Sequence, residues 1–314
     1  MIAALAAAAT GCGKDGARKS VGTDPTAGSG KVDSTTGSGA GSAGKAPARA
    51  ASRGPERVAY SLVDNRLAGH VQRNGGLVVL HGSVGLDKYA RFGGKGSGWK
   101  RGESDGKKTG SWNDGPLARV VVPLTAAQVA GTPSVWLRTR NDAARTVELR
   151  FNGAKVNAEL PAGWATTEIT APAGLLTEGE NEIMVYLGKG GPTQFEWMQV
   201  GGNAGGDDAP RLYDAASSSL VIAGGGGLAW YVLVPDKALV TADLRDGACQ
   251  VAVKATGDDG KTLEGTLQGL GSAVDLGALG GKAARLELTA SGCAEAHLAS
   301  AALVVPGATA APPP

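Results

Sequence analysis

The chain has 314 residues, of which 51 are glycine and 4% are aromatic. Glycine at more than twice the usual ~7%, with few aromatic side chains, argues against a helical bundle and favours a soluble all-β protein. The 31 basic and 29 acidic residues give a net charge of +2, so the charge indicates no nucleic-acid partner. No apolar run approaches the ~18 residues of a membrane-spanning helix.

Residues 1–11 are small and apolar, and they end in Gly11 directly before Cys12. This pattern resembles the end of a bacterial lipoprotein signal, in which a peptidase cuts before a cysteine that is then lipidated. The resemblance implies a lipid anchor at Cys12 in the bacterial cell envelope, at the outer membrane or the periplasmic face. Ala9 replaces the commoner Leu, and no basic residue precedes the apolar run. An ordinary secretory signal with an incidental cysteine is the alternative.

Residues 12–55 are rich in Gly, Ser and Ala, and they contain no aromatic residue. Such a segment buries too little apolar surface to offset its ordering entropy. We therefore expect a disordered tether with an r.m.s. span of about 35–40 Å.

Residues 56–204 are predicted to form one β-module. Apolar and polar residues alternate in 135–140, 145–151, 181–187 and 194–200, which is typical of half-buried strands. Asn152 and Gly153 follow one of these strands and predict a type I′ turn, with 154–160 as the return strand.

The order Arg150-Phe-Asn-Gly153, Gly163-Trp164, Pro172-Ala-Gly-Leu-Leu176 and Glu178-Gly-Glu-Asn-Glu-Ile183 resembles the second half of galactose-binding-domain-like jelly rolls. Modules of this kind occur as sugar-binding domains attached to glycoside hydrolases. The resemblance covers residues 135–200 and implies an antiparallel jelly roll. It identifies no ligand contacts, because the turn residues that carry it serve backbone geometry.

Residues 205–307 are predicted to form a second, shorter antiparallel β-sandwich, with strands at 241–244, 249–255, 285–289 and 299–305. Its length of about 100 residues suits a domain. One large sandwich that includes both modules is the alternative. Residues 308–314 are predicted to be an Ala/Pro linker.

Cys249 and Cys293 are the cysteines that remain if Cys12 is lipidated. In an exported protein we expect these two to form a disulfide. Two free thiols are the alternative.

Residues 91–115 contain eight glycines and no strand pattern, which predicts a long loop. Trp99 and Trp112 could stack on sugar rings, and Arg91, Lys100 and Arg101 could attract the carboxylate or sulfate groups of an acidic or sulfated polysaccharide. These five residues are the candidate ligand-binding set. The alternative is a solvated loop with one tryptophan folded onto the core.

The sequence predicts no catalytic residues and no metal ligands. The three histidines lie far apart and match no metal-binding spacing. The paired acidic residues Asp207-Asp208 and Asp258-Asp259 fall in predicted turns. We therefore expect no cofactor. The alternative is a calcium ion held by such turns.

Tyr60-Ser-Leu-Val-Asp-Asn-Arg-Leu67 and Leu303-Val-Val-Pro-Gly307, together with the lipoprotein start and tether, look like the non-catalytic N-terminal region of bacterial lipoprotein sulfatases. The family's nucleophile motif, Cys or Ser followed by x-Pro-x-Arg, is absent, and Lys45-Ala-Pro-Ala-Arg49 is the nearest run. The resemblance implies a surface lipoprotein region that binds carbohydrate or positions a domain. The alternative is the N-terminal part of a sulfatase, a sulfuric ester hydrolase, whose catalytic domain lies outside this chain.

Overall fold

The computed structural model describes residues 56–90, 99–112, 117–187 and 191–307. Within these ranges the regular elements are antiparallel strands and three short 3-10 helices, which confirms the predicted all-β class. None of the helices in the described ranges is long and apolar enough to span a membrane. Cys12, the tether at 12–55 and the linker at 308–314 lie outside the described residues.

The largest sheet contains eleven strands. Nine of them follow one another in the order β10-β7-β12-β3-β2-β15-β20-β17-β18, and β5 joins β12 at the side with β4 as its partner. Their bounds are β2 (His70–Arg73), β3 (Gly76–Leu80), β4 (Trp99–Ser104), β5 (Lys107–Trp112), β7 (Ser134–Asn141), β10 (Gly163–Thr170), β12 (Gln194–Val200), β15 (Gly226–Leu233), β17 (Gln250–Gly257), β18 (Thr262–Leu267) and β20 (Ala283–Ser291).

Two smaller sheets complete the fold. The four-stranded sheet has the order β6-β11-β8-β9, and the six-stranded sheet has the order β13-β14-β21-β16-β19 with β1 beside β21. The bounds are β1 (Glu56–Ser61), β6 (Ala118–Leu124), β8 (Arg145–Phe151), β9 (Ala154–Leu160), β11 (Gly179–Tyr186), β13 (Tyr213–Asp214), β14 (Ser219–Ala223), β16 (Leu239–Leu244), β19 (Ser272–Asp275) and β21 (Glu295–Pro306), with η1 (Val84–Lys88), η2 (Ala126–Gln128) and η3 (Gly277–Leu279).

The predicted strand at 145–151 shows how the sequence forms these elements. Val147, Leu149 and Phe151 of β8 are buried, and the residues between them are more exposed. Asn152 and Gly153 both have positive φ, 49° and 91°, which suits the predicted type I′ turn. β8 therefore returns as β9 with every residue from Arg145 to Phe151 paired.

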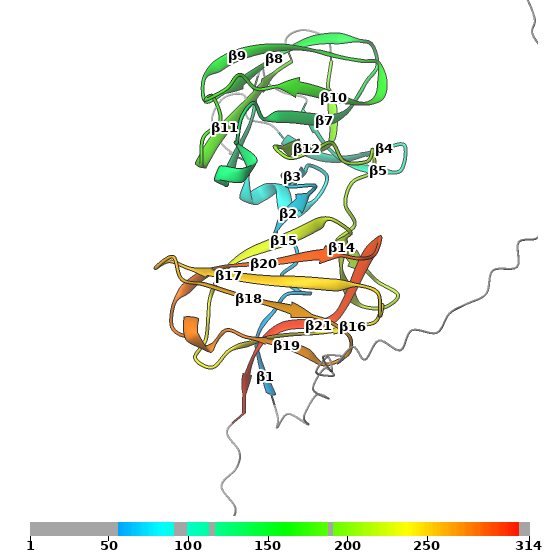
Figure 1. The fold of residues 1–314 in the computed structure, drawn as a ribbon. Helices are drawn as coiled ribbons and strands as arrows, with labels where there is room; N and C mark the ends of the chain where they lie inside the picture. Colours follow the sequence, from blue (N-terminus) through cyan, green and yellow to red (C-terminus); the bar gives the residue numbers. More distant parts are fainter. Residues whose placement is uncertain (1–55, 91–98, 113–116, 188–190, 308–314) are drawn as a thin grey trace, which may run out of the picture. The chain divides into compact units, whose positions relative to one another are not determined.

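Two hydrophobic cores lie on opposite faces of the large sheet. Leu77 and Val79 of β3 point into one core, and Val78 between them points into the other, because successive strand residues face opposite sides. The first core lies between the large sheet and the four-stranded sheet, and we call this layer pair the first sandwich. The second core lies between the large sheet and the six-stranded sheet, and we call it the second sandwich (Figure 1).

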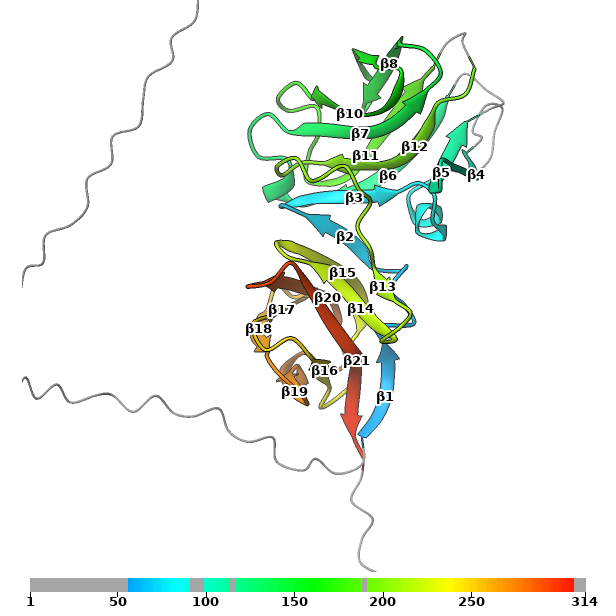
Figure 2. The same cartoon turned by 90° about the vertical axis from the view of Figure 1, so that its right-hand side faces the viewer.

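The first strand requires a correction to the predicted module boundary at residue 56. β1 pairs with β21, from Glu56 opposite Pro306 to Ser61 opposite Ala302, so it belongs to the second sandwich (Figure 2). A period-two pattern identifies a strand without naming its partner, and this partner lies more than two hundred residues away. The alternative of one large sandwich also does not fit, because one continuous sheet packs against two separate cores, one on each face.

The predicted long loop at 91–115 also requires correction. Residues 99–112 form the β4–β5 hairpin, which turns at Asp105 and Gly106, both with positive φ. The apolar alternation that marks a strand is missing because most of the β4 residues after Trp99 are exposed.

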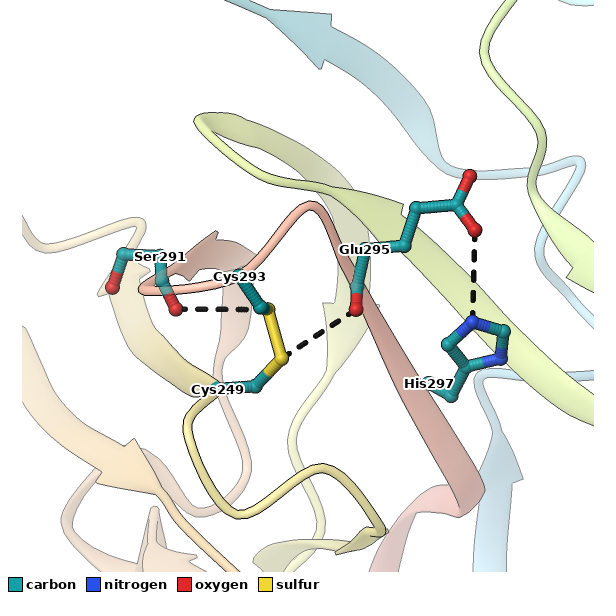
Figure 3. The surroundings of a disulfide bond; sticks show 5 residues. All are labelled: Cys249, Ser291, Cys293, Glu295 and His297. Carbon is teal, nitrogen blue, oxygen red and sulfur yellow. Dashed lines mark hydrogen bonds and ion pairs between the residues drawn. A yellow bond between two sulfur atoms is a disulfide. The ribbon is translucent and has the colours of Figure 1, made fainter.

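Cys249 and Cys293 form the predicted disulfide, with their Cα atoms 5.1 Å apart (Figure 3). The bond connects the segment before β17 to the turn between β20 and β21. The alternative of two free thiols does not hold in the structure.

Candidate functional site

The structure places Trp99 in the first core. Its ring centroid lies 4.7 Å from that of His81 and 5.3 Å from that of Phe195, and its Nε1 donates a hydrogen bond to the carbonyl oxygen of Arg119 at 3.1 Å. With 8% of its surface exposed, Trp99 has no free ring face for a sugar. The prediction that Trp99 binds a ligand is wrong, and the alternative of one tryptophan folded onto the core describes it correctly.

Of the other four candidate ligand-binding residues, the structure describes the side chains of Lys100 and Arg101. Arg101 is exposed and pairs with the carboxylate of Asp87. Lys100 is exposed on the same strand. The backbone of Trp112 lies opposite Trp99 in the hairpin, whereas its side chain and all of Arg91 lie outside the described residues.

The structure instead reveals a groove across the open face of the second sandwich. Tyr231 and Leu233 of β15 are 65% and 71% exposed, whereas Trp230 and Val232 beside them lie in the second core. The same alternation in β20 turns Arg285 outward. These outward side chains lie on the face of β15 and β20 opposite the second core, and neither core covers that face.

Three adjoining hollows of about 320, 630 and 590 Å³ make up this groove. Tyr231 and Arg285 line both the first and the second hollow, and Lys254 and Glu287 line both the second and the third. The lining crosses β2, β15, β20, β17 and β18, a width of about 19 Å at ~4.8 Å per strand spacing. We call it the Tyr231 groove.

Hydrogen-bonding groups along the groove hold one another in place. Arg285 Nη2 lies 2.7 Å from Glu287 Oε1, and Gln72 Nε2 donates to the same oxygen at 3.1 Å. The lining contains two basic residues, Lys254 and Arg285, against the acidic residues Glu178, Asp258, Glu264 and Glu287. This acidic excess opposes the binding of anionic ligands.

His70 lies at the inner end of the groove, where residues of the first sandwich such as Pro123 and Gln128 form the wall. Its ring meets the ring of Tyr231 edge-on at 5.7 Å, and its Nδ1 lies 2.9 Å from the hydroxyl of Tyr89. Burial, together with the positive charges of Lys88 and Arg285, lowers the pKa of His70 to about 4. The imidazole is therefore neutral at pH 7.

A second group of polar residues surrounds Trp164 on the first sandwich, and we call it the Trp164 cluster. Trp164 Nε1 donates to Asp105 Oδ2 at 3.1 Å. The guanidinium carbon of Arg138 and the Nζ of Lys107 lie 5.8 and 5.9 Å from the indole centroid. Glu196 completes the cluster, and its carboxylate lies 3.0 Å from Lys107 Nζ and 3.8 Å from Arg138 Nε.

Asp207 and Asp208 approach this cluster from the segment that follows β12. Arg138 Nη1 lies 3.2 Å from Asp207, and Lys107 Nζ lies 3.1 Å from Asp208. Burial by itself lowers the pKa of Lys107, but the hydrogen bonds and charges of Glu196 and Asp208 outweigh burial and raise this pKa above its ordinary value. Sequence reasoning missed the cluster, because its members come from separate strands that only the folded sheet brings together.

In the part of the chain that the structure describes, no three His, Cys, Asp or Glu residues are grouped so that they could hold a metal ion. The alternative of a turn-bound calcium gains no support from these residues.

No protein-family profile matches the chain, and no curated protein matches it. Among solved structures, a GH26-CBM35 β-(1,4)-mannanase from Podospora anserina is 18% identical, with 45% of this chain and 30% of that chain covered and a TM-score of 0.28. The CBM36-1 domain of a multidomain xylanase from the Trinervitermes trinervoides hindgut metagenome is 17% identical, with 40% and 97% covered and a TM-score of 0.29. The tandem CBM22 domains of Paenibacillus barcinonensis Xyn10C are 12% identical, with 82% and 99% covered and a TM-score of 0.19. With TM-scores this low, these similarities assign the chain to no family.

Proposed function

We propose that this protein is a non-catalytic polysaccharide-binding protein that holds a neutral oligosaccharide segment in the Tyr231 groove. The observation that carries the proposal is the exposed ring of Tyr231, which stands on a rigid strand above a groove about 19 Å wide. An aromatic ring fixed in this way offers an apolar face to a sugar ring at little cost in side-chain entropy.

The neighbouring polar groups support the same ligand. Arg285, Gln72 and Glu287 already form a connected set of donors and acceptors beside the ring, so hydroxyl groups of a sugar meet partners that are already oriented. The acidic excess of the lining favours a neutral chain over the acidic or sulfated polysaccharide predicted from residues 91–115.

The position of the protein in the cell is part of the proposal. Lipidation of Cys12 in the bacterial cell envelope would hold the groove near the membrane, and the composition of residues 12–55 supports a tether between anchor and groove. The resemblance of the sequence to sulfatase N-terminal regions supports a sulfatase catalytic domain as a partner. The proposal of polysaccharide binding does not depend on that partner.

Tyrosine substitutions test the groove. We expect the wild-type chain to bind at least one neutral polysaccharide in a panel of xylan, galactomannan and mixed-linkage glucan by isothermal titration calorimetry. Tyr231→Ala should weaken this binding about tenfold, the loss typical of an interface aromatic anchor. Tyr231→Phe should keep most of the affinity because the ring remains.

Tyr186→Ala provides the matched control. Tyr186 lies on β11 with the Arg150 guanidinium 4.2 Å from its ring centroid, and it does not line the groove. The control should bind as the wild type does. Absence of wild-type binding to the whole panel, or undiminished binding by Tyr231→Ala, would overturn the proposal. Hydrolysis of an aryl sulfate by the purified chain would overturn its non-catalytic part.

A further inference from the structure

We propose that the Trp164 cluster is a second binding site, which takes the carboxylate of an acidic saccharide, and that Asp207 of the same chain occupies its anion position. The site is independent of the Tyr231 groove. Arg138 shares the sheet face of Trp136 and Trp230, which belong to the second core, whereas Tyr231 points to the other face.

The register of two strands builds the anion position. Thr166 of β10 lies directly opposite Arg138 of β7. Thr166 Oγ1 donates to Asp207 Oδ1 at 2.7 Å, and Arg138 Nη1 lies 3.2 Å from the same oxygen. A hydroxyl and a guanidinium therefore converge on one carboxylate oxygen, an arrangement that a ligand carboxylate can use equally well.

The charges of the cluster favour an anion at the position that the carboxylate of Asp207 occupies. Asp105 is neutralised by Arg140, whose Nε lies 3.0 Å from its Oδ2. Without Asp207 and Asp208, Arg138 and Lys107 therefore pair with a single carboxylate, that of Glu196, which leaves one positive charge in excess. Arg138 and Glu196 are 9% and 6% exposed. The Nε of Arg138 is buried with no hydrogen-bond partner, so its guanidinium is incompletely satisfied. A buried excess charge is costly unless an opposite charge compensates it.

Trp164 supplies a surface for the sugar ring that bears the carboxylate. Its indole is half-buried, and the hydrogen bond to Asp105 at the tip of the β4–β5 hairpin fixes its orientation. The two cations beside the ring lie within 6 Å of its centroid. A saccharide stacked on Trp164 thus has its carboxylate next to Arg138, where Asp207 now lies.

Asp207 can leave this place without unfolding of the segment that carries it. Trp197 Nε1 donates to the carbonyl oxygen of Asp207 at 3.1 Å, and Arg73 Nη1 donates to the carbonyl oxygens of Gly206 and Asp208. These bonds hold the backbone, so rotation of one side chain vacates the anion position. Asp207 is 66% exposed in its pair with Arg138, and exposed ion pairs contribute little stability.

Removal of the competing charge tests the site. The full chain carrying Asp207→Asn should bind tri-galacturonate about fivefold more tightly than the wild type by calorimetry, since one repulsive charge and one competing ion pair are removed. The methyl ester of tri-galacturonate, which lacks the carboxylate charge, should show no gain. Trp164→Ala combined with Asp207→Asn should abolish the gain.

Asp246→Asn is the charge-matched control, since Asp246 is exposed in the turn before Cys249 and should leave the affinity at the wild-type value. If Asp207→Asn lowers the unfolding midpoint, Asp208→Asn repeats the test, because Asp208 is 94% exposed and its carboxylate pairs with Lys107. An unchanged affinity in the stable variant, or an equal gain for the methyl ester, would overturn the proposal. Neither result affects the Tyr231 groove, whose ligand is neutral.

Discussion

Val71 of β2 lies opposite Leu228 of β15 on one side and opposite Val78 of β3 on the other. The strand that carries Val71, β2, therefore joins the strands of both sandwiches into a continuous sheet. Each core covers one face over part of that sheet, and the remaining part of each face stays open. The Tyr231 groove and the Trp164 cluster lie on these two open areas, so the shared strand pairing explains why the chain has two candidate sites.

The close packing at this junction predicts a strong effect of Gly69→Ala. A Cβ at Gly69 would lie 2.9 Å from Cε2 of Trp230, whose Nε1 donates to the carbonyl oxygen of Asn65. We expect the free energy of unfolding to fall by about 1–3 kcal/mol, as for other overpacked sites. Urea denaturation followed by tryptophan fluorescence measures this. Gly247→Ala is the control because a Cβ there meets no atom within 4 Å, and equal stability of the two variants would contradict the expectation.

Replacement of Trp99 by Ala should destabilise the first sandwich and leave polysaccharide binding intact. The side chain is buried against Phe195 and His81, so its loss creates a core cavity that costs about 3–5 kcal/mol. Thermal unfolding measures the loss. Calorimetry below the unfolding temperature should give the wild-type affinity for the neutral polysaccharide, and a selective loss of binding would restore Trp99 as a ligand contact.

The disulfide should stabilise the second sandwich. Cys249 is fully buried, and the bond closes a loop with a sequence separation of 44 residues. We expect the double variant Cys249→Ala/Cys293→Ala to lose about 2–4 kcal/mol of unfolding free energy. Reductant should lower the unfolding free energy of the wild type by a similar amount and should leave that of the variant unchanged. A reductant effect on the variant would show that the loss has another source.

Acid should destabilise the protein through its buried histidines. Burial lowers the pKa of His70 to about 4 and that of His81 to about 3, both from 6.5. Below pH 6.5 the unfolded chain binds protons that the folded chain does not, so the free energy of unfolding falls as the pH falls toward 4. His70 contributes about 3 kcal/mol to this change.

Urea denaturation at pH 7.5, 6 and 5 measures the pH effect. His70→Gln should reduce the slope of unfolding free energy against pH, because glutamine does not titrate. An unchanged slope in this variant would mean that His70 is not the group responsible.

Some contacts follow directly from local sequence. Val147, Leu149 and Phe151 alternate with polar residues, and Asn152-Gly153 follows them, so the β8–β9 hairpin was predictable with its turn type. Residues 99–112 show the opposite case. Their hairpin has too few buried residues to produce an alternating pattern, and its place beside β12 depends on the backbone pairing of Gln194 with Ser111 and of Phe195 with Gly110.

The candidate sites could not be predicted from the sequence, because local periodicity does not show which residues of different strands lie together. Tyr231 falls in a segment whose apolar residues occupy both faces, so the sequence does not say which of Trp230 and Tyr231 is exposed. Arg138, Thr166 and Glu196 lie on three strands, and each by itself is typical of an ordinary polar strand position.

The sequence by itself determined the all-β class, most of the strands of the 135–200 region, the Asn-Gly turn and the cysteine pair, because these depend on the alternation of neighbouring residues and on residue type. Only the tertiary structure decided that β1 pairs with β21 and that β2 joins β15. It also decided that the two cores cover opposite faces of the shared sheet, each over different strands, so that part of each face stays open. Strand pairing across long separations is set by how the two cores bury their apolar faces together, and the local periodicity of a strand carries no record of its partner.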